Sequence, residues 1–162
     1  MKRAVVRLRK PQPGDFGRVV AMHGELYARE FGYDATFEAL IAEIVAGFVR
    51  DFNPKRERCW MAEMSGEVVG SVFLVRHSST TSKLRLLIVD PKARGHGLGR
   101  RLTRACIRFA RNAGYRTMVL WTQSHLGAAR AIYRAQGFRL VSSERHRSFG
   151  KRLVAEVWEL RL

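Results

Sequence analysis

The stretch LIVDPKARGHGLGRRL, residues 87–102, decides how the rest of the chain is interpreted. An apolar run ends at Asp90, glycines follow at positions 95, 97 and 99, and a basic segment with helical spacing begins near Leu98. A strand, a glycine-rich loop and a helix in this order expose backbone N–H groups that have no partner inside the helix. These groups and the helix dipole favour an anion, and a pyrophosphate fits such a loop. A glycine-rich turn without a ligand is the alternative that the loop alone leaves open.

The spacing of these residues excludes two common phosphate-binding motifs. A Walker A loop needs Gly-Lys-Ser/Thr, which the stretch lacks. A dinucleotide fingerprint needs a third glycine where Arg100 stands, and no acidic residue closes a following strand at the right distance. A third pattern, [QR]-x-x-G-x-[GA], is matched by Arg94, Gly97 and Gly99.

Hydrophobic periodicity on both sides of the stretch predicts a mixed α+β domain with helices on both faces of the sheet. Asp15 and Thr36 are the predicted N-caps of two early helices, and Ser124 is predicted to start a late one. The expected order is β-α-α-β-β-β-α-β-α-β-β. The predicted strands are 4–9, 58–64, 68–77, 83–90, 117–122, 137–147 and 153–162, and the predicted helices are 15–30, 36–49, 98–113 and 124–136.

Composition limits the class of protein. The net charge of +16 favours an anionic partner, but the basic residues are spread along the whole chain, which does not favour nucleic acid. No apolar run is long enough for a membrane span and no secretory signal is recognisable, so we expect a single cytoplasmic domain over residues 1–162. The five histidines are scattered, which predicts no metal site, and Cys59 and Cys106 are expected to be buried thiols.

A second segment, AARAIYRAQGF at residues 128–138, gives the glycine loop its context. Together the two segments resemble the GCN5-related N-acetyltransferase (GNAT) superfamily, and the element order agrees over essentially the whole chain. Three further segments, at residues 23–40, 83–91 and 146–160, resemble the acetyltransferase half of proteins that carry a MarR-type winged-helix regulator. We expect that regulator to be absent. The resemblance implies α/β/α layers, a largely antiparallel sheet of about seven strands with about four helices, and two splayed central strands at 83–90 and 117–122.

The resemblance also implies acetyl-CoA as co-substrate and no metal. The backbone of the 83–90 strand would run beside the pantetheine arm, and the N–H groups of residues 95–100 would hold the pyrophosphate. Leu126 stands where the family often has Asn, so a side-chain hydrogen bond to the coenzyme is not expected there. The residues expected to bind the coenzyme are Leu87, Ile88, Val89, Arg94, Gly95, His96, Gly97, Leu98, Gly99, Arg100, Leu126, Ala129 and Tyr133.

Tyr133 matches the family tyrosine that protonates the departing thiolate. A phenol with an ordinary pKa of about 10 can donate to a thiolate whose ordinary pKa is about 8.5. The sequence does not identify the general base, because the strand KLRLLIV has no carboxylate where some relatives place one. Glu30, His23 and Glu38 are the candidates, Glu30 as base or acceptor contact, and a water relay is the alternative.

We therefore expect an N-acetyltransferase that transfers acetyl directly to a primary amine of a small molecule or peptide. The alternative is an acyl-CoA-binding sensor, or a regulatory or nucleic-acid-associated module without turnover. The early helices and the hairpin ERHRSFGKR, residues 144–152, are expected to shape the acceptor pocket, where Arg147, Lys151 and His146 could favour a carboxylate. A monomer or homodimer is expected, without a membrane partner.

Overall fold

The computed structural model describes residues 4–162, so the first three residues of the predicted domain lie outside it. It confirms the predicted order of elements and adds a short 3-10 turn, η1 (Pro91–Ala93). The helices are α1 (Asp15–Phe31), α2 (Ala35–Arg50), α3 (Leu98–Asn112) and α4 (Gly127–Ala135). The strands are β1 (Val6–Arg9), β2 (Arg58–Met64), β3 (Glu67–Arg76), β4 (Thr81–Val89), β5 (Thr117–Gln123), β6 (Arg139–Ser148) and β7 (Lys151–Arg161).

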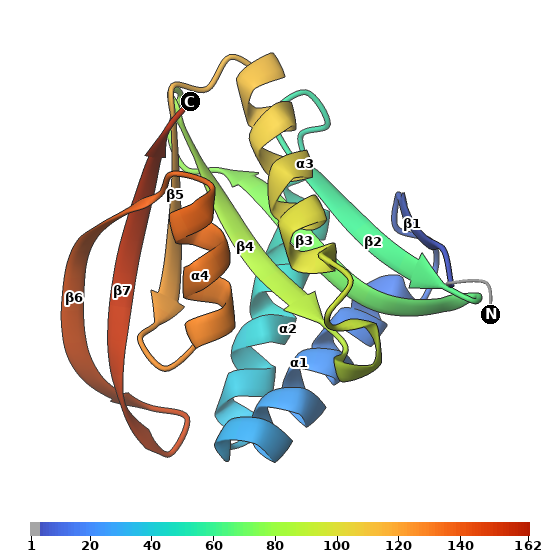
Figure 1. Ribbon diagram of the computed structural model, residues 1–162, viewed down its shortest axis with the longest axis vertical. Helices are drawn as coiled ribbons and strands as arrows, with labels where there is room; N and C mark the ends of the chain where they lie inside the picture. Colours follow the sequence, from blue (N-terminus) through green and yellow to red (C-terminus); the bar gives the residue numbers. More distant parts are fainter. Residues whose placement is uncertain (1–3) are drawn as a thin grey trace.

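The strands form one seven-stranded sheet in the order β1-β2-β3-β4-β5-β7-β6. The pair β4/β5 is parallel and every other neighbouring pair is antiparallel. Helices α1 and α2 cover one face, and α3 and α4 cover the other, as Figure 1 shows. The predicted layers and mixed sheet are thus confirmed.

Two hydrophobic cores fill the space between the sheet and its helices. The core under α3 and α4 contains Trp158 and Met118, which are at most 2% exposed. The core under α1 and α2 contains Phe73 and Met61, both 0% exposed. Cys106 lies in the first core and Cys59 in the second, and both are free thiols, as predicted. Burial raises the pKa of each thiol, so neither is an activated nucleophile.

The helix starts differ from the predicted caps. Asp34, and not Thr36, caps α2, because its carboxylate accepts a hydrogen bond from the Thr36 backbone N–H at 3.0 Å. Asp15 accepts instead from the Gln12 N–H at 2.7 Å and pairs with Arg9. Helix α4 begins three residues after Ser124.

The late start of α4 has a backbone cause. The Ser124 N–H donates to the carbonyl of Val154 on β7, which keeps the chain extended beyond β5. Leu126 then precedes the first helical residue, without a side-chain cap.

The two central strands separate as predicted. β4 and β5 pair only from Thr81↔Thr117 to Leu84↔Leu120 and then diverge, which opens a wedge beside α4 in Figure 1. A β-bulge in β4 sits at the start of the wedge, and within it Leu86 has a φ of 53°. The Ser71 hydroxyl donates to the Leu86 carbonyl at 3.1 Å and holds the bulge. Beyond Leu84, the edge of β4 that faces β5 is therefore free of a strand partner.

Candidate active site

A cavity of about 670 Å³ opens where the glycine loop meets the wedge, and we call it the loop cavity. Its walls come from α1, the end of β4, the loop before α3, and the start of α4. Of the residues predicted to bind the coenzyme, all except His96 and Tyr133 line it. The predicted residues that do line the loop cavity are Leu87, Ile88, Val89, Arg94, Gly95, Gly97, Leu98, Gly99, Arg100, Leu126 and Ala129.

The glycine loop presents unpartnered backbone donors to this cavity. Gly97 precedes the first residue of α3 with a φ of 70°, and no side chain caps the helix. The first intrahelical bond runs from Arg101 to the Gly97 carbonyl, so the N–H groups of residues 98–100 have no intrahelical acceptor. A Cβ added at Gly95 or Gly97 would meet no atom within 4 Å. The space beside these glycines is open, and it is available to a ligand.

Gly99 has a different role from its two neighbours. A Cβ at this position would lie 2.7 Å from Cδ1 of Ile132, on α4. Its glycine allows α3 and α4 to pack closely, and this packing brings the start of α4 against the loop cavity. The three glycines of the motif therefore serve two purposes, ligand access and helix packing.

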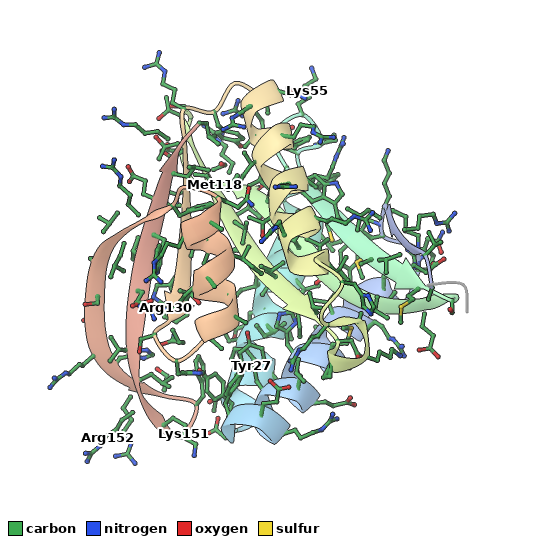
Figure 2. The ribbon with its side chains drawn as sticks, in the orientation of Figure 1. Tyr27, Lys55, Met118, Arg130, Lys151 and Arg152 are labelled. Carbon is green, nitrogen blue, oxygen red and sulfur yellow. The ribbon has the colours of Figure 1, made fainter. Side chains whose placement is uncertain are left out.

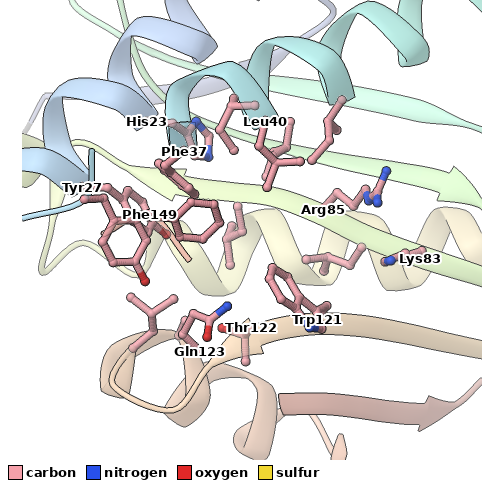
Figure 3. A pocket seen from close by; sticks show the side chains of 18 of the residues that line it. His23, Tyr27, Phe37, Leu40, Lys83, Arg85, Trp121, Thr122, Gln123 and Phe149 are labelled. Atoms are coloured by element: carbon pink, nitrogen blue, oxygen red, sulfur yellow. The ribbon is translucent and has the colours of Figure 1, made fainter. Parts of the chain in front are cut away.

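A second cavity of about 400 Å³ lies between the sheet and the two early helices, and we call it the aromatic cavity. Tyr27, Phe37, Trp121 and Phe149 contribute its aromatic wall (Figure 3). Phe149 comes from the β6–β7 turn, in the predicted hairpin. None of the residues that line the cavity is Asp or Glu. Both cavities are lined by Tyr27, Leu87, Leu126 and Ala129, so they meet at the end of β4 and the start of α4.

Tyr133 lines the aromatic cavity, one helical turn after Ala129 on α4. Residues four apart share a helix face, so Tyr133 lies beside the junction of the two cavities. It is 5% exposed, and its burial raises the pKa of the phenol. The hydroxyl therefore carries its proton at neutral pH.

The three candidate bases are dispersed. His23 lines the aromatic cavity, but its Nδ1 is 2.8 Å from the Val19 carbonyl and burial lowers its pKa to about 4, which makes it a weak proton acceptor. Glu30 lines the loop cavity instead, where its carboxylate pairs with Arg94 at 2.8 Å. Glu38 is exposed, lines neither cavity and lies over Gly24 of α1.

The structure adds a contact that the motifs do not reveal. The Tyr33 hydroxyl is 2.6 Å from Nε2 of His125, and it joins the loop after α1 to the loop before α4. Tyr33 lines the aromatic cavity and His125 lines the loop cavity. Because they are far apart in sequence, only the packing of the two loops brings them together.

The hairpin contributes little charge to the cavities. Arg147 and Lys151 are exposed and line neither one. Figure 2 shows Lys151 and its neighbour Arg152 at the outer end of the hairpin. His146 does not line the aromatic cavity but contacts a residue that does. Its Nε2 is 2.9 Å from Oε1 of Gln123.

Residues 4–162 contain neither a cluster of metal-binding side chains nor a membrane-spanning helix. No group of three or more His, Cys, Asp or Glu side chains gathers there as a metal site. None of the helices in this part of the chain has the length and apolar character needed to cross a membrane.

Known proteins share both the sequence pattern and the fold. A mycothiol acetyltransferase from Amycolatopsis mediterranei is 32% identical over 105 residues, which cover 56% of this chain and 35% of that protein. An N-acetylaspartate synthetase from Danio rerio is 34% identical over 109 residues, which cover 67% of this chain and 38% of that protein. The chain thus spans little more than a third of the length of these two relatives.

A solved structure from Salmonella typhimurium, determined with its cofactor acetyl-CoA, superimposes with a TM-score of 0.78 at 19% identity. The match covers 96% of this chain and 93% of that one, and at this identity it shows the fold. The acetyltransferase (GNAT) family matches residues 21–138, which contain the glycine loop, the wedge and Tyr133. The chain therefore belongs to the GNAT acetyltransferase family.

Proposed function

We propose that this chain is an N-acetyltransferase that transfers acetyl from acetyl-CoA directly to a primary amine of a small molecule or peptide. The observation that carries the proposal is the junction of two cavities beside an open strand edge. Leu87, Leu126 and Ala129 line both cavities, so a donor in one and an acceptor in the other would meet there. Holding two reactants in a reactive geometry is by itself enough to accelerate a reaction greatly.

The loop cavity fits the coenzyme. The free N–H groups of residues 98–100 and the open space beside Gly95 and Gly97 suit a pyrophosphate. Arg100 adds positive charge there. The unpaired edge of β4 after Leu84 suits the amide-bearing pantetheine arm, which can pair with a strand edge.

Acetyl-CoA, when bound, supplies an acetyl group activated as a thioester. Tyr133 holds the proton that the thiolate takes up as the carbon–sulfur bond breaks and the amine nitrogen bonds to the acetyl carbon. No carboxylate lines the aromatic cavity, so we assign removal of the amine proton to water. The chain's main contribution is then orientation of the two substrates and donation by one phenol.

The relatives support the class of reaction, since their names denote acetyl transfer and N-acetylaspartate synthesis. The resemblance to the acetyltransferase half of winged-helix-fused proteins stays a prediction. So do the monomer or homodimer and the cytoplasmic location.

The test combines turnover with coenzyme binding. The full chain is incubated with acetyl-CoA and a panel of primary amines, thiol release is followed with a chromogenic reagent, and acetyl-CoA affinity is measured by calorimetry. Binding with amine-dependent thiol release is expected. Binding without release on any amine would favour the acyl-CoA sensor, and absence of binding would overturn both.

A further inference from the structure

Two cations, Lys83 and Arg85, line the aromatic cavity. Lys83 and Arg85 alternate along β4, so both point to the sheet face that α1 and α2 cover. Figure 3 shows both beside the cavity, at the same end as Trp121. Each is half-buried, and within residues 4–162 neither forms an ion pair.

This arrangement is electrostatically unfavourable without an anion. Burial lowers the pKa of both groups, and the neighbouring Arg85 lowers the pKa of Lys83 further. Two like charges that have lost part of their water need a counter-charge. The cavity lining contains no Asp or Glu that could supply one.

A third side chain has a hydrogen-bond donor that no described protein atom accepts. Gln123 is 4% exposed, and its Oε1 lies 2.9 Å from Nε2 of His146. Its Nε2 is the one buried side-chain nitrogen or oxygen in the described part of the chain that has no hydrogen-bond partner. In Figure 3 the Gln123 amide faces the cavity. A buried amide without a partner is costly, and a ligand oxygen would satisfy it.

Most of the remaining wall is apolar or aromatic. Phe37, Leu40, Trp121 and Phe149 line the cavity, whose volume of about 400 Å³ lies in the range of small-molecule sites. Positive charge and a free amide donor thus face an aromatic surface. This combination matches a ligand with one anionic end and an apolar body.

We propose that the aromatic cavity selects an amine acceptor that carries a carboxylate and an apolar side chain, with Lys83 and Arg85 as the carboxylate site and the Gln123 amide as a separate hydrogen-bond donor to the acceptor. The inference rests on the proposed function, since it places the amine where the two cavities meet. Lys83 and Arg85 are not among the residues lining the loop cavity, so the coenzyme phosphates do not neutralise them. These residues lie on β4 and β5, away from the exposed hairpin cations.

The test uses two probes that differ only in the carboxylate, N-acetyl-L-phenylalanine and N-acetyl-L-phenylalaninamide. Their affinities are measured by calorimetry for the full chain, for a Lys83→Met/Arg85→Met double variant and for Gln123→Met. We expect the wild type to bind the carboxylate at least about tenfold more tightly than the amide. The double variant should bring this preference to within about twofold, and Gln123→Met should weaken the binding of both probes by about threefold.

Arg145→Met is the matched control, because it removes an exposed cation on β6 that lines neither cavity. It should keep the full preference, which separates a local site from attraction by the net charge of +16. The amide probe is the folding control, since a misfolded variant would lose both ligands. Equal wild-type binding of the two probes, no binding of the carboxylate, or equal loss in Arg145→Met would overturn the assignment.

Turnover separates this inference from the proposed function. Amine-dependent thiol release together with equal binding of the two probes would leave the acetyltransferase standing and remove the carboxylate site. A carboxylate preference without turnover on L-phenylalanine or any other amine would keep the anion site and remove its role in acceptor selection.

Discussion

The loop cavity and the aromatic cavity meet at Leu87 but are built differently. The loop cavity contains backbone N–H groups without intrahelical acceptors, open glycines and a free strand edge. The aromatic cavity instead presents side chains from α1, α2, β4, β5, α4 and the β6–β7 turn. A backbone site needs a fixed spacing of small residues, whereas a side-chain site can change one residue at a time. One fold can therefore keep one donor and take many acceptors.

Loss of the Tyr133 hydroxyl should have the largest effect. We expect Tyr133→Phe to lower kcat about a hundredfold, within the range for a positioned proton donor, and to leave acetyl-CoA affinity within twofold. Steady-state kinetics and calorimetry measure the two. Tyr115→Phe is the control, because that hydroxyl donates to the Arg56 carbonyl and Tyr115 lines neither cavity. An unchanged kcat in Tyr133→Phe would show that the acid lies elsewhere.

Gly97→Val tests the backbone side of the comparison. A β-branched residue at a φ of 70° is strained, and its side chain would enter the space assigned to the pyrophosphate. We expect acetyl-CoA affinity to fall about a hundredfold, as for the loss of one or two charge-assisted hydrogen bonds. Gly66→Val carries similar strain at a φ of 80° in the β2–β3 turn, and it should keep the affinity. If both variants bind acetyl-CoA normally, the loop is not the cradle.

His23 tests whether charge inside the aromatic cavity matters to the fold. Its pKa is about 4 in the folded chain, against about 6.5 when unfolded. The unfolded chain therefore binds more protons between these values, so the free energy of unfolding should fall as pH drops from about 6.5 to about 4. The loss from this group is on the order of 1–3 kcal/mol. Urea unfolding of His23→Gln should lack this component, and parallel wild-type and variant profiles would contradict it.

Glu30→Gln should have the smallest effect. The Glu30–Arg94 pair is partly exposed, and such pairs contribute little free energy. We expect kcat to stay within twofold and acetyl-CoA affinity to rise by at most about threefold, because a carboxylate leaves the surroundings of an anionic ligand. A hundredfold fall in kcat, measured at saturating substrates, would instead make Glu30 the base.

The sequence was most informative where function depends on local spacing. The order of elements and the residues of the glycine loop follow from patterns within about 15 neighbouring positions. The helix starts were harder, because Asp34 and Thr36 are both good caps and Ser124 is drawn to β7 by a long-range bond. The carboxylate site was missed for the same reason. Lys83 and Arg85 look like the polar residues of an ordinary alternating strand until α2 and β5 enclose them.

The wedge between β4 and β5 also makes the sheet an incomplete structure. Only four residue pairs, Thr81↔Thr117 to Leu84↔Leu120, join its N-terminal and C-terminal halves, and a ligand along the free edge of β4 would supply the missing contacts. Such a ligand binds only the folded chain, so it raises the free energy of unfolding. The increase is about 2.7 kcal/mol when the ligand concentration is a hundred times Kd. The melting temperature of this protein should therefore rise with the concentration of the coenzyme.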